Sequence, residues 1–224
     1  SSSSSASDMQ TLSSIKNGYS GLVSSYESTK KTFNTELNSA LSDLSNSAKT
    51  VANMNFSFSE SDITTNADGT KTYSDSLTSA IKNVKQLVSD YNTALDFFSD
   101  NKSVSNRASA LATEFADTTY RADQYSAIGI TVDSKTGALS VDEDKLATAL
   151  TTESDRAANS LGSNGLAGKA ESHVALANFQ KDKIFPTATQ MFGSETTAAS
   201  LYTGSTLLNI SGYATTGNLL NMLF

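Results

Sequence analysis

The sequence predicts a mainly α protein: an elongated antiparallel helical bundle or coiled coil of three or four long helices, with a small β-hairpin element. Two stretches, residues 77–98 and 104–125, place apolar or small residues at an unbroken spacing of four and three. This spacing averages about 3.5 residues per turn, so each row stays on one side of a helix that lies along a partner. Only a few residues around Asp100 separate the rows, which favours an antiparallel pair. The rows are Leu77, Ile81, Val84, Val88, Tyr91, Leu95 and Phe98, and Val104, Ala108, Leu111, Phe115, Thr118, Ala122 and Tyr125.

A first long helix is predicted before these two, beginning at about Ser13 or Tyr19 and ending at about Ala52. Its apolar row also steps by threes and fours and is interrupted by Lys30, whose ammonium can reach past a partner helix into solvent. The row is Tyr26, Lys30, Phe33, Leu37, Ala40, Leu44 and Val51. A last helix is expected to carry Ala170, Val174, Ala177 and Ile184 on one face and to end before Pro186, the only proline.

Two segments alternate apolar and polar residues with the period of two that is typical of strands. Residues 54–58 predict one half-buried strand. Residues 128–132 and 139–141 flank the loop 133–137 and predict a β-hairpin, in which Gly137 supplies the positive φ that closes the turn.

Helix starts are predicted from capping residues. Asn101 or Ser103 is expected to cap the helix over 104–125. Ser140 with Glu143 has the spacing of a capping box, which predicts a short helix after the hairpin.

The expected domain organisation is a disordered Ser-rich N-terminus over residues 1–12, followed by a single elongated helical-bundle domain over 13–224 with its β-element at about 54–58 and 128–141. The sequence lacks an initiator Met, so we expect a fragment or a processed form. Residues 217–224 are abruptly apolar and uncharged. Such a segment is expected to dock on the bundle or on a partner. The candidate interaction residues are Leu219, Leu220, Met222, Leu223 and Phe224.

Composition excludes several classes of function. The 224 residues carry a formal net charge of −7, and Lys and Arg are scattered, so we expect neither nucleic acid nor an anionic membrane surface as a partner. The absence of Cys excludes disulfides, thiolate nucleophiles and Cys-bound metals. No apolar run approaches the ~18 residues that a membrane span needs.

Candidate catalytic and metal-binding patterns are weak. His173 is the only histidine and is expected to lie at the surface or at the edge of the core. Thr64, Asn66, Asp68 and Gly69 echo half of a calcium loop, but Thr64 stands where the first carboxylate belongs and Asp75 where a bidentate Glu is expected, which favours a polar turn. We expect no enzyme activity, cofactor, metal or small-molecule substrate. The pattern Ser-x-x-Lys recurs at Ser13/Lys16, Ser28/Lys31, Ser79/Lys82 and Ser99/Lys102, as a Ser-rich composition predicts, without the motifs that accompany it in acyl-transfer enzymes.

An ordered series of motifs resembles the C-terminal region of the flagellar hook-associated protein 2 family, the filament-cap proteins. Residues 84–95 are similar to the helix of that family that carries a Tyr-Asn pair, here Tyr91-Asn92. Residues 128–146 are similar to its Ile-Gly-Ile hairpin and the short helix that follows, and Gly165-Leu166-Ala167 stands where the family often has Gly-Leu-Ala. The large outer domains that cap proteins insert between these helices are missing here, because Phe98 and Val104 are nearly adjacent.

The resemblance implies a shortened relative of bacterial, export-related origin that keeps the helical stalk. The expected function is that of a non-enzymatic structural or assembly protein of the flagellum or cell surface, acting through helix–helix packing with flagellar subunits or with copies of itself. The expected location is extracellular. The alternative is a cytoplasmic helical adaptor or chaperone-like binding protein that shares the stalk fold.

Overall fold

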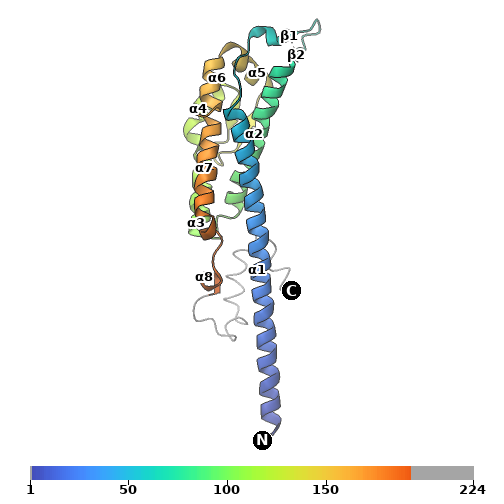
Figure 1. Ribbon diagram of the computed structural model, residues 1–224, viewed down its shortest axis with the longest axis vertical. Coiled ribbons are helices and arrows are strands. Elements are labelled where there is room, and N and C mark those ends of the chain that lie inside the picture. The colour runs from blue at the N-terminus through green and yellow to red at the C-terminus, as the bar shows by residue number, and fades with distance from the viewer. Residues whose placement is uncertain (1, 193–224) are drawn as a thin grey trace. The chain divides into compact units, whose positions relative to one another are not determined.

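The computed structural model describes the backbone of residues 2–192 and the side chains of residues 17–18 and 20–191 (Figure 1). These residues form a mainly α-helical fold with two small antiparallel sheets, which confirms the predicted fold class. The α-helices are α1 (Ser2–Ala52), α2 (Asp75–Asp100), α3 (Asn106–Phe115), α4 (Ala122–Ala127), α5 (Glu143–Thr152), α6 (Ser154–Leu161), α7 (Leu166–Gln180) and α8 (Ala188–Phe192). Short 3-10 helices are η1 (Glu60–Asp62), η2 (Ala116–Arg121) and η3 (Lys181–Lys183), and the strands are β1 (Ile63–Thr65), β2 (Lys71–Tyr73), β3 (Ile130–Val132) and β4 (Leu139–Val141).

The chain divides into two compact units, and α1 contributes to both. Unit 1 takes the chain up to Leu37, Asp100–Ser109 and the chain from Lys181 onward. Unit 2 takes Asn38–Ser99 and Ala110–Gln180. The single domain that the sequence predicted over 13–224 stays a prediction, because part of that range lies outside the described residues.

Helix α1 begins at Ser2, although residues 1–12 were predicted to be disordered. Serine is only moderately less favourable than alanine in a helix, and adding residues to an existing helix costs far less than nucleating one. A helix that is fixed further along can therefore continue through a Ser-rich segment. The predicted C-terminal end at Ala52 is confirmed. The apolar row of α1 is buried at Tyr26, Phe33, Leu37, Ala40, Leu44 and Val51, and Lys30 is half-buried.

In unit 1, a small aromatic cluster joins α1 to the segment that follows α7. The ring of Phe185 lies 5.8 Å from that of Tyr26 and 5.1 Å from that of Phe33. The Tyr26 hydroxyl donates a hydrogen bond of 2.7 Å to the carbonyl oxygen of Pro186. Burial raises the pKa of Tyr26, with a further contribution from Glu27, so this phenol stays protonated as a donor.

In unit 2, every residue of the predicted 77–98 row is at most 5% exposed. The helix predicted over 104–125 is interrupted, because α3 ends at Phe115 and the tighter η2 follows. The Tyr91 hydroxyl donates to the Phe115 carbonyl at 2.6 Å, so that carbonyl is used by a side chain at the point where the helix tightens. The predicted row nevertheless stays buried at Thr118 and Tyr125 beyond the break. The N-cap of α3 lies in unit 1 and is Ser105, whose hydroxyl accepts from the Ala108 amide at 3.0 Å, and not Asn101 or Ser103 as predicted.

The strand predicted at residues 54–58 is wrong. Met54, Phe56 and Phe58 are half-buried and alternate with exposed Asn55 and Ser57, as predicted, but the segment pairs with no strand among the described residues. Alternation of apolar and polar residues indicates an extended backbone with one face covered. It does not show that a neighbouring strand is present to form hydrogen bonds. The first sheet instead joins β1 and β2 across a turn at Gly69, which has φ +84°.

The predicted hairpin over 128–141 is confirmed as the antiparallel pair β3–β4, with Ile130 opposite Val141 and Val132 opposite Leu139. Gly137 has φ +77°, as predicted. The predicted capping box is wrong: Ser140 lies within β4, and the Asp142 carboxylate caps α5 by accepting from the Lys145 amide at 3.0 Å.

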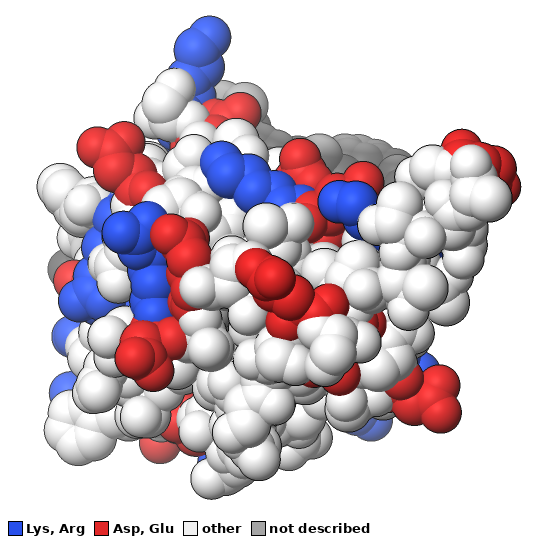
Figure 2. All heavy atoms as spheres, turned by 90° about the horizontal axis from the view of Figure 1, so that it is seen from above, with Lys and Arg blue, Asp and Glu red and all other residues white. Residues whose placement is uncertain are grey.

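Acidic and basic side chains are intermixed on the face that Figure 2 presents. Among the described residues, no helix is both long and apolar enough to cross a lipid bilayer.

Candidate functional site

The Tyr91-Asn92 pair of α2 belongs to the motifs that carry the family resemblance. The Asn92 amide donates to the carbonyl oxygen of Leu139 at 2.8 Å, and its oxygen accepts from the Leu139 amide at 2.8 Å. The neighbouring Tyr91 hydroxyl binds the Phe115 carbonyl. Two adjacent side chains thus fix the hairpin and the end of α3 to α2, and we call this group of contacts the Tyr-Asn clamp.

Two glycines of the hairpin motifs are required by close packing as well as by backbone conformation. Gly129 has φ +91°, and a Cβ there would lie 2.7 Å from the backbone nitrogen of Leu146. A Cβ at Gly137 would lie 2.8 Å from the Thr118 hydroxyl oxygen. The Ile-Gly-Ile and Lys-Thr-Gly segments therefore hold the hairpin tightly against α5 and η2, which is a structural task.

Replacing Asn92 by alanine is expected to lower the free energy of unfolding by about 2–3 kcal/mol, because the backbone amide and carbonyl of the buried Leu139 both lose their partner. Urea titration followed by circular dichroism measures this loss. Asn46→Ala, at an exposed position of α1 whose side chain has no comparable contact, is the control and should change stability by less than about 0.5 kcal/mol. Equal effects of the two substitutions would contradict the clamp.

A second polar group joins η2 to α7 within unit 2. The His173 Nε2 lies 2.9 Å from Asp117 Oδ1, and the Lys169 ammonium lies 3.4 Å from Asp117 Oδ2. The side chain of His173 is 6% exposed and that of Asp117 18%. The sequence placed His173 at the surface or core edge, and the structure places it at the inner edge of this polar group, with its ring 5.1 Å from that of Phe115.

The electrostatic environment of Asp117 favours its charged form. Burial alone would raise the pKa of this carboxyl, but the hydrogen bond and charge of His173, together with Lys169, outweigh burial and hold the pKa below its ordinary value of 3.8. Burial raises the pKa of the adjacent Tyr91 far above its ordinary value, with a further contribution from Asp117. Tyr91 therefore acts as a hydrogen-bond donor and not as an acid near neutral pH.

The lowered pKa of Asp117 predicts a loss of stability in acid. Its carboxylate contributes fully above the unfolded value near 3.8, and the contribution disappears as the pH falls through the lower folded value. Asp117→Asn should therefore destabilise the protein by about 2 kcal/mol at neutral pH, and this deficit should shrink on acidification below about pH 4. Thermal unfolding at a series of pH values measures it, with exposed Asp123→Asn as control. A deficit that stays constant down to about pH 2 would contradict the assignment.

Potential metal ligands gather at the same place. Glu114, Asp117 and His173 each offer one donor atom, and these three atoms lie within 4.8 Å of one another. A cavity of about 450 Å³ opens here, lined in part by Glu114, His173, Lys169 and Arg121. The sequence analysis missed Asp117 and Glu114 because Asp117 lies 56 residues from His173 and no local motif joins them.

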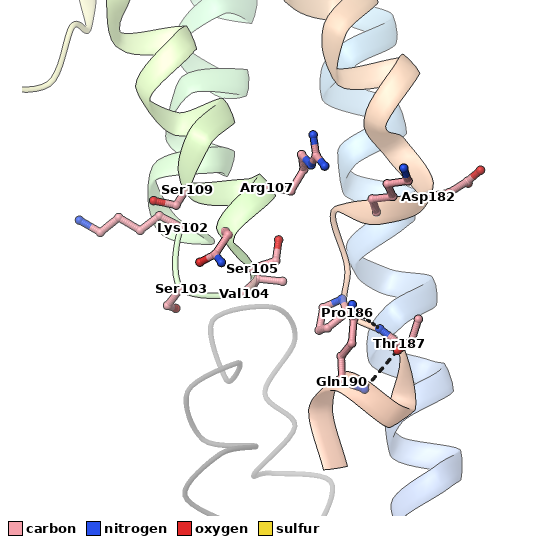
Figure 3. A pocket seen from close by; sticks show the side chains of 12 residues that line it. Lys102, Ser103, Val104, Ser105, Arg107, Ser109, Asp182, Pro186, Thr187 and Gln190 are labelled. Atoms are coloured by element: carbon pink, nitrogen blue, oxygen red, sulfur yellow. Dashed lines mark hydrogen bonds between the residues drawn. The ribbon is translucent and has the colours of Figure 1, made fainter. Parts of the chain in front are cut away.

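Unit 1 contains a polar pocket of about 780 Å³ beside the N-terminus of α3 (Figure 3). Lys102 and Arg107 extend from it in different directions. Thr187 and Gln190 form two hydrogen bonds with each other. The Thr187 backbone amide donates to Gln190 Oε1 at 2.9 Å, and the Gln190 backbone amide donates to the Thr187 hydroxyl oxygen at 3.1 Å. The basic groups do not converge on one point, so this pocket indicates no particular ligand.

Two other groups of candidates came from the sequence. The candidate interaction residues Leu219, Leu220, Met222, Leu223 and Phe224 lie outside the described residues. The half calcium loop is a hairpin turn: Asn66 donates from its amide to the Thr70 and Thr72 hydroxyls, and the Asp68 carboxylate accepts from the Thr70 amide at 2.9 Å. These polar groups are used within the turn.

No protein-family model, no curated protein and no solved structure matches this chain.

Proposed function

We propose that the chain is a non-enzymatic structural or assembly protein related to the helical stalk of the flagellar hook-associated protein 2 family. The observation that carries this proposal is the Tyr-Asn clamp. The residues that resemble the family lie together in unit 2, and Tyr91, Asn92, Gly129 and Gly137 each serve a backbone contact. These residues therefore support the packing of a rigid helical body.

The use of the apolar residues also supports a structural role. The long apolar rows of α1 and α2 pack in the interior. Apart from Lys30, each residue of the two rows is at most 6% exposed. By contrast, Tyr120 of η2 and Phe179 of α7 are 90% and 88% exposed. Nearly free aromatic side chains are costly in water and are enriched where proteins bind one another. They are suited to a protein partner, such as a flagellar subunit or a second copy.

The proposal is tested by locating the protein in its own bacterium. An antibody against the chain should detect it in the sheared filament and extracellular fraction, and the double variant Tyr120→Ser/Phe179→Ser should be exported but lost from the filament fraction. Lys82→Ser, at an exposed position of α2, serves as the control and should stay with the filaments. Detection in the cytosol alone, together with soluble cytosolic partners, would overturn the proposal in favour of the alternative, a helical adaptor or chaperone-like protein.

A further inference from the structure

We propose that Glu114, Asp117 and His173 bind one divalent transition-metal ion of the zinc class. The three residues come from the last turn of α3, from η2 and from α7, all within unit 2. Their donor atoms are one imidazole nitrogen and two carboxylate oxygens, a combination that zinc and neighbouring metals accept. This site is independent of the flagellar role proposed above.

The spacing of two donors is within about 0.5 Å of that of neighbouring ligands on one ion. His173 Nε2 and Asp117 Oδ1 are 2.9 Å apart. Two metal–ligand bonds of about 2.1 Å that meet at the tetrahedral angle place their donor atoms about 3.4 Å apart. An ion can therefore replace the hydrogen bond between the two groups once their side chains separate by about 0.5 Å. Glu114 is exposed, so its side chain is free to turn its carboxylate toward the same ion.

The surroundings hold the two inner ligands in place. The His173 ring lies 5.1 Å from the ring of Phe115 and 6.5 Å from that of Tyr91, and only 6% of its side chain is exposed. Lys169 contacts the other oxygen of Asp117, at 3.4 Å, and leaves Oδ1 for the ion. Carboxylate ligands are commonly held in this way by an outer hydrogen-bond donor. The Lys169 side chain is 39% exposed, so its ammonium can swing toward solvent when the ion adds positive charge.

The number and kind of ligands select the class of metal. Three protein donors with an adjoining cavity of about 450 Å³ leave room for water as a further ligand, as in open zinc sites. Calcium takes about six to eight oxygen ligands, and magnesium retains most of its water, so neither gains from a buried imidazole. The site is therefore expected to prefer Zn²⁺, Co²⁺ or Ni²⁺ to Ca²⁺ and Mg²⁺.

The chain allows an unusually clear test, because His173 is its only histidine and it has no cysteine. We expect Zn²⁺ to bind with one equivalent in calorimetry, to raise the melting temperature, and to shift the NMR signals of the single imidazole at that equivalence point. Glu114→Gln and His173→Gln should each weaken binding by at least ~10-fold. Asp123→Asn, an exposed carboxylate of α4 outside the cluster, should leave the affinity unchanged.

Several results would overturn the proposal. They are an imidazole signal that Zn²⁺ leaves unchanged, an equal rise in melting temperature with Ca²⁺ or Mg²⁺, and equal weakening by Asp123→Asn. Any of these would make the cluster a hydrogen-bonded pair beside an exposed acid. Glu114 is exposed, so Glu114→Gln is expected to fold. It therefore decides the question even where His173→Gln does not fold.

Discussion

Replacing Val88 by aspartate should lower the free energy of unfolding by about 4 kcal/mol, because it places an unpaired carboxyl in the buried row of α2. Val88 is 5% exposed and belongs to the 77–98 row that the sequence predicted to be interior. Burial would raise the pKa of the introduced carboxyl, so the penalty should be largest at neutral pH and should diminish toward pH 4 as the group takes up a proton. Urea unfolding at both pH values measures the effect.

The neighbouring Ser89 provides the control. It is exposed on the same helix, so Ser89→Asp introduces the same charge one residue further on and should change stability by less than about 0.5 kcal/mol. A melting temperature that Val88→Asp leaves unchanged would show that the row is not buried in solution.

Replacing Gly137 by alanine should destabilise the protein by about 3 kcal/mol. An L-residue at its φ of +77° costs roughly 1–2 kcal/mol. The added Cβ would in addition lie 2.9 Å from the Ala116 Cα, which forces the hairpin away from η2 and adds about 1–3 kcal/mol. The Thr118 hydroxyl, which donates to the Gly137 carbonyl at 2.6 Å, would lose its geometry as well.

Gly69 separates the two contributions. Its φ of +84° is similar, but a Cβ there would meet nothing within 4 Å. Gly69→Ala should therefore cost only the conformational part, about 1–2 kcal/mol. Equal losses for the two substitutions, measured by chemical denaturation, would show that the hairpin is not packed closely against η2.

The sequence predicted those features that a local pattern determines. The row from Leu77 to Phe98 and the 128–141 hairpin depend on residue spacing and on one glycine, and both are confirmed. The break after Phe115 was not predicted, because it coincides with a hydrogen bond from Tyr91, which is 24 residues away. The strand at 54–58 failed for the same reason, since pairing depends on a partner that a local pattern does not specify.

The candidate site was less predictable than the fold. His173 was noticed as the only histidine, but Asp117 follows Phe115 of an apolar row and looks like an ordinary exposed acid in the sequence. Only the packing of η2 against α7 brings these two side chains together. The clamp by Asn92 is similar: its position was singled out by resemblance, and its bonds to Leu139 follow from tertiary structure.

The Asn92 amide also protects the hairpin from other chains. A two-stranded sheet has two outer edges whose free backbone groups can recruit a strand from another molecule and start aggregation. At Leu139 both backbone groups are already bound by a side chain, so the outer edge of β4 is closed at its first residue. The Asn92 side chain thus makes at Leu139 the two backbone hydrogen bonds that a third strand would otherwise make. This contact lowers the tendency of the hairpin to aggregate, because it blocks edge pairing at that residue without adding a strand.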